Sequence, residues 1–222
     1  SKSGSADLLE HAGARIDLTA DQIAECVRQT GFGFMLAPAH HTAMKHAIGA
    51  RKELGVRTIF NVLGPLTNPA HVKSEMMGVF SADLVEPLAH VLKKLGSEHV
   101  MVVHSDDGMD EISVGSSTQV AELKNGKVKT YSINPEQFDI PLYSLDNVAV
   151  SNPGESLAVI RSVFTGEESA ASAITAMNAG ASIYVAGLAE DLAGGIGRAQ
   201  ELLRSGEVAA KFDQYVEFTN SF

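Results

Sequence analysis

The most concentrated chemistry in the sequence is the acidic stretch HSDDGMDE, residues 104–111. It directly follows HVMVV at 99–103, an apolar run that predicts a buried strand. Ligands of α/β sheets bind beyond the carboxyl ends of strands. Carboxylates placed there suit Mg²⁺ or Mn²⁺, and Mg²⁺ needs few protein ligands beside water and phosphate. The adjacent pair Asp110-Glu111 is therefore the candidate metal site; a solvated acidic turn bent at Asp-Gly is the alternative.

Two further stretches carry polar or cationic side chains. In RTIFNVLGPLTNPA, residues 57–70, Gly64 permits close approach of the backbone to a ligand, and prolines stiffen the path. A purely structural connection is the alternative. PAHHTAMKHAIGARKE, residues 38–53, places histidines, a lysine and an arginine in and before a predicted helix. Its HHxxxxH spacing lacks the glutamate of a zinc-protease motif, so contact with an anionic ligand is the better interpretation.

Two other features are interpreted as structural. LAGGIGRAQELL at 192–203 resembles a dinucleotide-binding loop only superficially, because no strand feeds it and the spacing differs from GxGxxG. A turn between helices is the favoured interpretation. Cys26 lies at helical spacing from Ile23 and next to Val27, which predicts a core residue rather than a nucleophile.

The elements that must position these residues follow from hydrophobic periodicity and turn signals. A capping box, Thr19 with Gln22, predicts a helix start. Helices are expected at 8–14, 19–31, 42–54, 84–95, 155–164, 168–186 and, as the last one, 197–205. Strands or extended segments are expected at 31–38, 76–80, 99–103, 111–114, 119–123 and 128–133, the last two joined by a hairpin at Asn125-Gly126. This order predicts an α/β fold with a central, mostly parallel, mixed sheet flanked by helices and no domain linker.

Composition limits the classes of function. The 222 residues suffice for a hydrophobic core, and 27 acidic against 17 basic residues give a net charge of −10. That charge argues against a nucleic-acid or anionic-membrane surface. The single cysteine excludes an intrachain disulfide, and no apolar run approaches the roughly 20 residues of a membrane span. We therefore expect a cytoplasmic protein without a signal peptide, and neither nucleic acid nor membrane as a partner.

Taken together, five segments resemble the anthranilate phosphoribosyltransferase family of tryptophan biosynthesis. They are SGSADLLEHAG, GFGFMLAPAHHTAMKH, LGVRTIFNVLGPLTNPA, HSDDGMDEIS and NAGASIYVAGLAEDL. The resemblance covers essentially the whole chain, and RTIFN-x-LGPLTNPA and DGMDE-[IV]-S are its most specific parts. It implies the C-terminal α/β domain of the nucleoside phosphorylase/phosphoribosyltransferase class. It also implies transfer of a phosphoribosyl group from phosphoribosyl pyrophosphate (PRPP) to anthranilate, with release of pyrophosphate and assistance from Mg²⁺.

The resemblance also implies roles for individual residues. Asp110 and Glu111 match the family's metal-binding pair. The positions implied to contact PRPP are Ser5 and Ser1, and those implied to lie at the anthranilate pocket or its entry are Arg51, Pro38, His41, Met44 and Gly64. No catalytic residue is assigned, because the aromatic amine of anthranilate is uncharged at neutral pH and positioning with electrostatics can do most of the catalysis.

Full-length members of that family begin with a small helical domain that forms the dimer contact, followed by a GTGGD phosphate loop and a KHGNR segment. This chain begins just after KHGNR would end. We therefore expect residues 1–222 to be a single α/β phosphoribosyltransferase domain, truncated at its N-terminus, with little or no activity alone. A homodimer is expected for the full-length protein.

Three alternatives stay open at this level. A pyrimidine nucleoside phosphorylase shares the architecture, but those enzymes lack the LGPLTNP loop and the DGMDE pair. A catalytically silent, nucleic-acid-binding relative would be expected to show a basic surface, which the net charge opposes. A non-catalytic scaffold fragment would keep the site residues as remnants.

Overall fold

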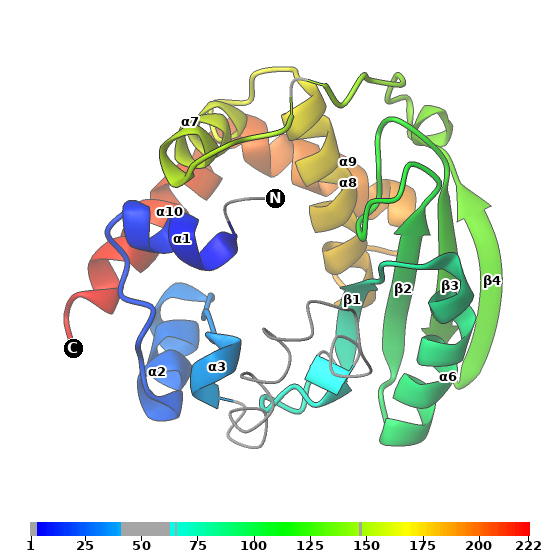
Figure 1. Cartoon of the computed structure of the whole chain (residues 1–222), viewed down its shortest axis with the longest axis horizontal. Helices are drawn as coiled ribbons and strands as arrows, with labels where there is room; N and C mark the ends of the chain where they lie inside the picture. The colour runs from blue at the N-terminus through cyan, green and yellow to red at the C-terminus, as the bar shows by residue number, and fades with distance from the viewer. Residues whose placement is uncertain (1–3, 41–62, 65, 147) are drawn as a thin grey trace, which may run out of the picture. The chain divides into compact units, whose positions relative to one another are not determined.

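The computed structural model describes residues 4–40, 63–64, 66–146 and 148–222. They form two compact units: Ser1–His71 with Val150–Arg161 and Glu207–Phe222, and Val72–Ala149 with Ser162–Gly206 (Figure 1). Each unit is described by itself. The helix expected at 42–54 lies outside the described residues. Within the described ranges, no helix has the length and apolarity required to span a membrane.

Helices are the regular secondary structure of the described part of the first unit. Its helices are α1 (Ser5–His11), α2 (Ala20–Thr30), α3 (Ala37–His40), most of α7 (Pro153–Val163) and α10 (Glu207–Thr219). The predicted capping box is confirmed at α2: Gln22 N donates to Thr19 Oγ1 at 3.3 Å, and Thr19 N donates to Gln22 Oε1 at 2.9 Å. The helix ends at Gly31, whose φ of +76° is the left-handed conformation that favours glycine.

The core of this unit joins the two ends of the chain. Ile23 and Cys26 of α2 pack with Tyr215 of α10, and Cys26 has no exposed surface. The interpretation of Cys26 as a core residue is confirmed, and burial raises the pKa of its thiol. Helix α10 was not expected from the sequence. Only Tyr215 and Thr219 are buried along it, so its apolar stripe is too narrow to stand out as a pattern.

The segment at 31–38, expected as a strand or extended segment, contains no strand. Residues 32–36 lack regular secondary structure, and Pro38 lies inside α3 rather than at the end of a strand. Phe34 and Met35 nevertheless pack against the core, as their apolar character requires. The described part of this unit contains no strand. An extended segment there would therefore have no partner for backbone pairing.

The second unit contains the sheet. Its strands are β1 (Ser74–Gly78), β2 (His99–Ser105), β3 (Thr118–Lys124) and β4 (Lys127–Ile133), in the order β1-β2-β3-β4. The mixed α/β sheet is confirmed, but among these strands parallel pairing is limited to β1 and β2. After β2 the chain turns back through a loop instead of a crossover helix, which makes the β2–β3 pairing antiparallel. The predicted hairpin at Asn125-Gly126 joins β3 to β4.

Helices cover both faces of this sheet (Figure 1). Helix α6 (Val85–Leu95), preceded by a 3₁₀ turn (Ala82–Leu84), packs on β2, β3 and β4. Helix α8 (Ala170–Val185) packs on β1 and β2, and α9 (Leu192–Ser205) packs on α8. Met101 and Val103 of β2 enter the core beneath α8. A second 3₁₀ turn (Pro135–Phe138) follows β4.

The sequence suggested that the glycines of LAGGIGRAQELL form a turn between helices. This prediction is wrong, because they lie inside α9. Asp191 caps the helix by accepting a hydrogen bond from Gly194 N at 2.8 Å, so α9 begins at Leu192 rather than at Gly197. The glycines serve packing. A Cβ on Gly195 would lie 2.3 Å from the carbonyl oxygen of Gly180 in α8, so the two helix backbones touch directly.

A polar cluster lies beneath the apolar core of the sheet. Glu122 of β3 accepts hydrogen bonds from Tyr184 Oη at 2.7 Å and from Tyr131 Oη at 3.0 Å, and its Oε1 lies 3.1 Å from His99 Nε2. Lys124 Nζ donates to Tyr184 Oη at 2.9 Å. Burial by itself would raise the pKa of Glu122, but these hydrogen bonds and the charge of His99 bring the pKa below its ordinary value.

Replacing Glu122 by glutamine is expected to lower the free energy of unfolding at neutral pH by about 2 kcal/mol, because the tyrosines lose a charged acceptor. A carboxyl group with a lowered folded-state pKa contributes stability above its unfolded pKa and loses that contribution as pH falls through the folded value. The difference between wild type and Glu122→Gln should therefore shrink as pH falls below 4.5, the ordinary value. Urea denaturation at several pH values measures it. A constant difference, or an equal effect of the exposed control Glu98→Gln, would contradict the prediction.

Candidate functional site

The acidic stretch forms a loop at the carboxyl end of β2, where the sequence predicted it. The loop begins with a tight turn in which Gly108 N donates to Ser105 O at 2.9 Å and Ser105 N donates to Met109 O at 3.0 Å. Gly108 adopts a φ of +89°, a conformation that glycine takes without strain. The bend at Asp-Gly, which the alternative interpretation of this stretch included, is therefore present. The segment 111–114, expected as a strand, has no strand conformation and completes the loop.

Three buried hydroxyl-bearing residues hold the base of this loop. Ser105 Oγ donates to the carbonyl oxygen of Glu111 and lies 2.9 Å from Thr118 Oγ1. Ser113 N donates to Ser105 Oγ at 3.1 Å and to Thr118 Oγ1 at 3.2 Å. All three residues are fully buried, so each bond is shielded from water. The backbone of Glu111 is thereby fixed to the ends of β2 and β3.

Helix α8 holds the loop from the other side. Asn178 Nδ2 donates to the carbonyl oxygen of Ile112 at 2.8 Å, and Asn178 Oδ1 accepts from Ile112 N at 2.9 Å. Ile112 and Val114 are fully buried in the core. The alternation of apolar residues in EISV, 111–114, suggested a strand paired with a neighbour in the sheet. The two hydrogen bonds to Asn178 take the place of that pairing. Asn178 was not among the predicted site residues; a polar side chain in an Ala-rich apolar helix was the signal.

Strand β1 approaches the loop more closely still. A Cβ on Gly78 would lie 1.5 Å from the carbonyl oxygen of Asp110 and 2.5 Å from its carbonyl carbon. No side chain fits in that space, so the backbone of Asp110 rests directly against β1. Sequence reasoning did not single out Gly78, because nothing local marks a glycine in a strand as a contact to a distant loop.

The four carboxylates of the loop differ in their partners. Asp107 accepts hydrogen bonds from Ser113 Oγ and, at 3.3 Å, from Met109 N; Asp106 accepts from Gln119 Nε2 at 3.4 Å. The carboxylates of Asp110 and Glu111 have no hydrogen bond or ion pair with any residue in the described part of the chain, and both residues are exposed. Two carboxylates thus shape the loop, and the other two have no partner in the described part of the chain.

Comparison with known proteins supplies the family. Residues 1–209 match the model of the glycosyl transferase family, a/b domain. The chain belongs to this family. The anthranilate phosphoribosyltransferase of Methylobacillus flagellatus is 56% identical over 214 residues, which are 96% of this chain and 63% of that protein. The chain therefore spans less than two thirds of that relative's length.

Solved structures agree with this family. The anthranilate phosphoribosyltransferase of Thermus thermophilus is 38% identical with a TM-score of 0.92, over 99% of this chain and 65% of that one. The Saccharomyces cerevisiae enzyme was solved in complex with PRPP and Mg (27% identical, TM-score 0.89, 99% of this chain and 63% of that one). It was also solved in complex with 4-fluoroanthranilate (26% identical, TM-score 0.89, 99% of this chain and 64% of that one). The resemblance to anthranilate phosphoribosyltransferases and the α/β fold are confirmed.

Within this glycosyl transferase domain, the free pair fits Mg²⁺ by its chemistry. Partial burial of its carboxyl group raises the pKa of Glu111, and the adjacent Asp110 carboxylate raises it further. A divalent cation held by these residues would favour the charged form of both carboxylates. In the described residues, His, Cys, Asp and Glu side chains form no group of three or more that could hold a metal ion. Two carboxylates, with other positions left to water and phosphate, are the donor set that Mg²⁺ accepts.

The remaining predicted residues are placed unevenly. Ser5 is the exposed first residue of α1, and Gly64 is half-buried, with its carbonyl oxygen 3.2 Å from Thr67 N. A Cβ on Gly64 would meet no atom of the described residues within 4 Å. Pro38 lies in α3. Ser1, His41, Met44 and Arg51 lie outside the described residues, and their roles stay predictions.

Proposed function

We propose that this chain is the α/β part of an anthranilate phosphoribosyltransferase. In that role it would transfer the phosphoribosyl group of PRPP to the amine of anthranilate and release pyrophosphate. The observation that carries the proposal is the loop after β2, whose backbone is hydrogen-bonded to Ser105 and Asn178 and whose Asp110 and Glu111 carboxylates have no partner in the described part of the protein. The names of the relatives, and the PRPP and Mg bound to the yeast enzyme, support the same reaction.

Asp110 and Glu111 would hold Mg²⁺, which when bound neutralises charge on the departing pyrophosphate. The loop contributes by rigidity: Ser105, Thr118 and Asn178 fix its backbone, so the two carboxylates need little reorganisation when a ligand arrives. Ser5, with an exposed hydroxyl at the start of α1, would contact PRPP.

The acceptor would be held by residues of the other predicted group. Arg51 would bind the carboxylate of anthranilate, and Gly64 would let the backbone lie beside the aromatic ring. Pro38, His41 and Met44 would line the entry path. The aromatic amine is uncharged at neutral pH, so it can attack carbon-1 of the ribose without a general base. The chain's task is alignment of this amine, and no catalytic acid or base is assigned.

Three properties stay predictions for the whole protein. Because the chain spans 63% of its relative from Methylobacillus flagellatus, we propose that these residues alone have little or no transferase activity. We also propose the homodimer that the resemblance implies and the cytoplasmic location that the composition predicts.

Calorimetric titration of PRPP into the chain, with and without Mg²⁺, tests the role of the loop. We expect binding that depends on Mg²⁺ and that weakens at least about tenfold in the double variant Asp110→Asn, Glu111→Gln, because the cation loses its charged ligands. Asp106→Asn is the matched control: it removes one charge from the same loop, and its affinity should stay within about twofold.

Two results would overturn this assignment. One is PRPP affinity that is equal with and without Mg²⁺; the other is Mg²⁺-dependent affinity that survives in the double variant. Absence of any Mg²⁺-dependent binding by the unaltered chain would likewise contradict a working half-site. Circular dichroism and the melting temperature of each variant separate loss of binding from loss of fold.

A further inference from the structure

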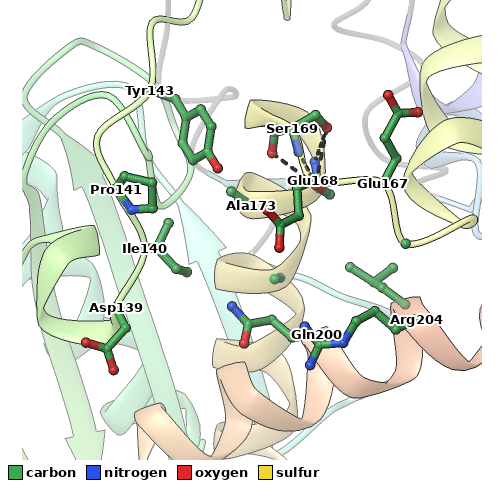
Figure 2. Close-up of a pocket in the computed structure, with 14 residues that line it drawn as sticks. Asp139, Ile140, Pro141, Tyr143, Glu167, Glu168, Ser169, Ala173, Gln200 and Arg204 are labelled. Carbon is green, nitrogen blue, oxygen red and sulfur yellow. Dashed lines mark hydrogen bonds between the residues drawn. The ribbon is translucent and has the colours of Figure 1, made fainter.

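A cavity of about 220 Å³ lies within the second unit (Figure 2). Neither Asp110 nor Glu111 lines it. Its walls come from the segment after the second 3₁₀ turn, from the residues that precede and begin α8, and from the C-terminal half of α9. The floor is apolar: Ile140, Ala176 and Leu203 are buried at 4%, 2% and 6% exposure. A ligand of this cavity therefore needs an apolar part.

Four polar side chains border the same space. Figure 2 shows Glu168 directed toward α9, where Gln200 and Arg204 extend into the cavity, and the phenol of Tyr143 directed toward α8. None of these four side chains makes a hydrogen bond or an ion pair with another residue in the described ranges. Glu168 and Arg204 carry opposite charges and line one cavity, yet they form no ion pair with each other.

The loop that carries Glu168 lies against the helix that carries Arg204. Gly166 precedes Glu168 and has a φ of +75°, and a Cβ there would lie 3.0 Å from the Cα of Arg204. The loop is thus packed directly on the backbone of α9 at Arg204. Glu167 and Asp139 also line the cavity, but Figure 2 shows their carboxylates directed away from the guanidinium of Arg204.

We propose that this cavity binds a zwitterionic α-amino acid with an apolar side chain. Arg204 would bind the carboxylate, for which a planar guanidinium offers two parallel donors. Glu168 would accept from the ammonium group, and the side chain would cover Ile140 and Leu203. A purely anionic ligand is disfavoured by Glu168, and a purely cationic one by Arg204. The proposal does not depend on the proposed transferase function.

Calorimetric titration of L-valine, L-leucine and L-phenylalanine into the full chain tests the site. At least one of them should bind saturably. For that amino acid, the N-acetyl derivative lacks the ammonium and the amide derivative lacks the carboxylate, and each should bind at least about tenfold more weakly. The variants Arg204→Gln and Glu168→Gln should each weaken binding of the unmodified amino acid to a similar extent.

Arg198→Gln is the matched control on the same helix. Its guanidinium pairs with Glu201 at 2.9 Å and does not line the cavity, so binding should be unchanged. No saturable binding of any of the three amino acids would overturn the proposal. So would blocked derivatives that bind as tightly as the parent amino acid, or inorganic phosphate that binds in place of the amino acid. Unchanged melting temperatures confirm that a loss of binding is not a loss of fold.

Discussion

Replacing Gly78 by alanine is expected to lower the free energy of unfolding by about 3 kcal/mol or more and to abolish Mg²⁺-dependent PRPP binding. The added methyl group would lie 1.5 Å from the carbonyl oxygen of Asp110, so β1 or the acidic loop must move. The atoms in the way belong to backbone, which cannot rotate aside as a flexible side chain can. Urea denaturation gives the stability change, and titration of PRPP with Mg²⁺ gives the change at the site.

Ser74→Ala, at the opposite end of the same strand, is the control and should change stability by less than about 1 kcal/mol. If Gly78→Ala kept both its stability and its Mg²⁺-dependent binding, the direct contact of β1 with the Asp110 backbone would not position the loop. A variant that folds normally but no longer binds would place the effect in the loop alone.

Replacing Gly195 by alanine is the second change with a large expected effect, a loss of about 3 kcal/mol. The Cβ would lie 2.3 Å from the carbonyl oxygen of Gly180 and 3.1 Å from its carbonyl carbon. Helix propensity acts in the opposite direction, since alanine stabilises a helix by about 1 kcal/mol relative to glycine. Steric contact between α8 and α9 must therefore outweigh propensity.

Gly197→Ala separates these two contributions, because it changes the same residue type two positions along α9. A Cβ there would meet no atom of the described residues within 4 Å, and the position is exposed. We expect it to be neutral or stabilising by up to about 1 kcal/mol. Thermal and urea unfolding of both variants should give opposite signs. Equal stabilisation by both would show that the close helix crossing carries no energetic constraint.

Features encoded by neighbouring residues were predictable from the sequence. Thr19 and Gln22 cap α2 through hydrogen bonds that span three positions, and Asn125-Gly126 supplies two left-handed residues for the hairpin. The strand before the acidic loop followed from a run of apolar residues. In each case the stabilising contact lies within a few residues of the signal.

Features that depend on distant contacts were missed. Ile112 and Val114 alternate as in a strand, but Asn178 and the backbone amide of Tyr143 take the bonds that a strand neighbour would have made. The start of α9 was hidden because its glycines have low helix propensity, and their packing against α8 outweighs it. Propensity is a weak guide wherever tertiary packing decides.

The candidate site also combines a part encoded by neighbouring residues with a part that depends on distant contacts. Asp110-Glu111 was predictable, because adjacent carboxylates after an apolar strand are a local signal. The residues that make the pair rigid were not, since Gly78, Ser105 and Asn178 reach it from three separate elements. Sequence reasoning therefore singled out the pair proposed to hold Mg²⁺ and missed the residues that hold its loop in place.

The discontinuous composition of the first unit has a consequence for how the chain folds as it is synthesised. Arg15 N donates to Thr219 Oγ1 at 3.0 Å across 204 residues of sequence, and Tyr215 completes the core around Cys26. During synthesis α1 and α2 leave the ribosome long before α10. Their apolar faces therefore lack the contact with α10 while the sheet is being synthesised. Contacts of such high sequence separation form late and slowly. Helices α1 and α2 are therefore exposed to aggregation and to chaperones until α10 has been made.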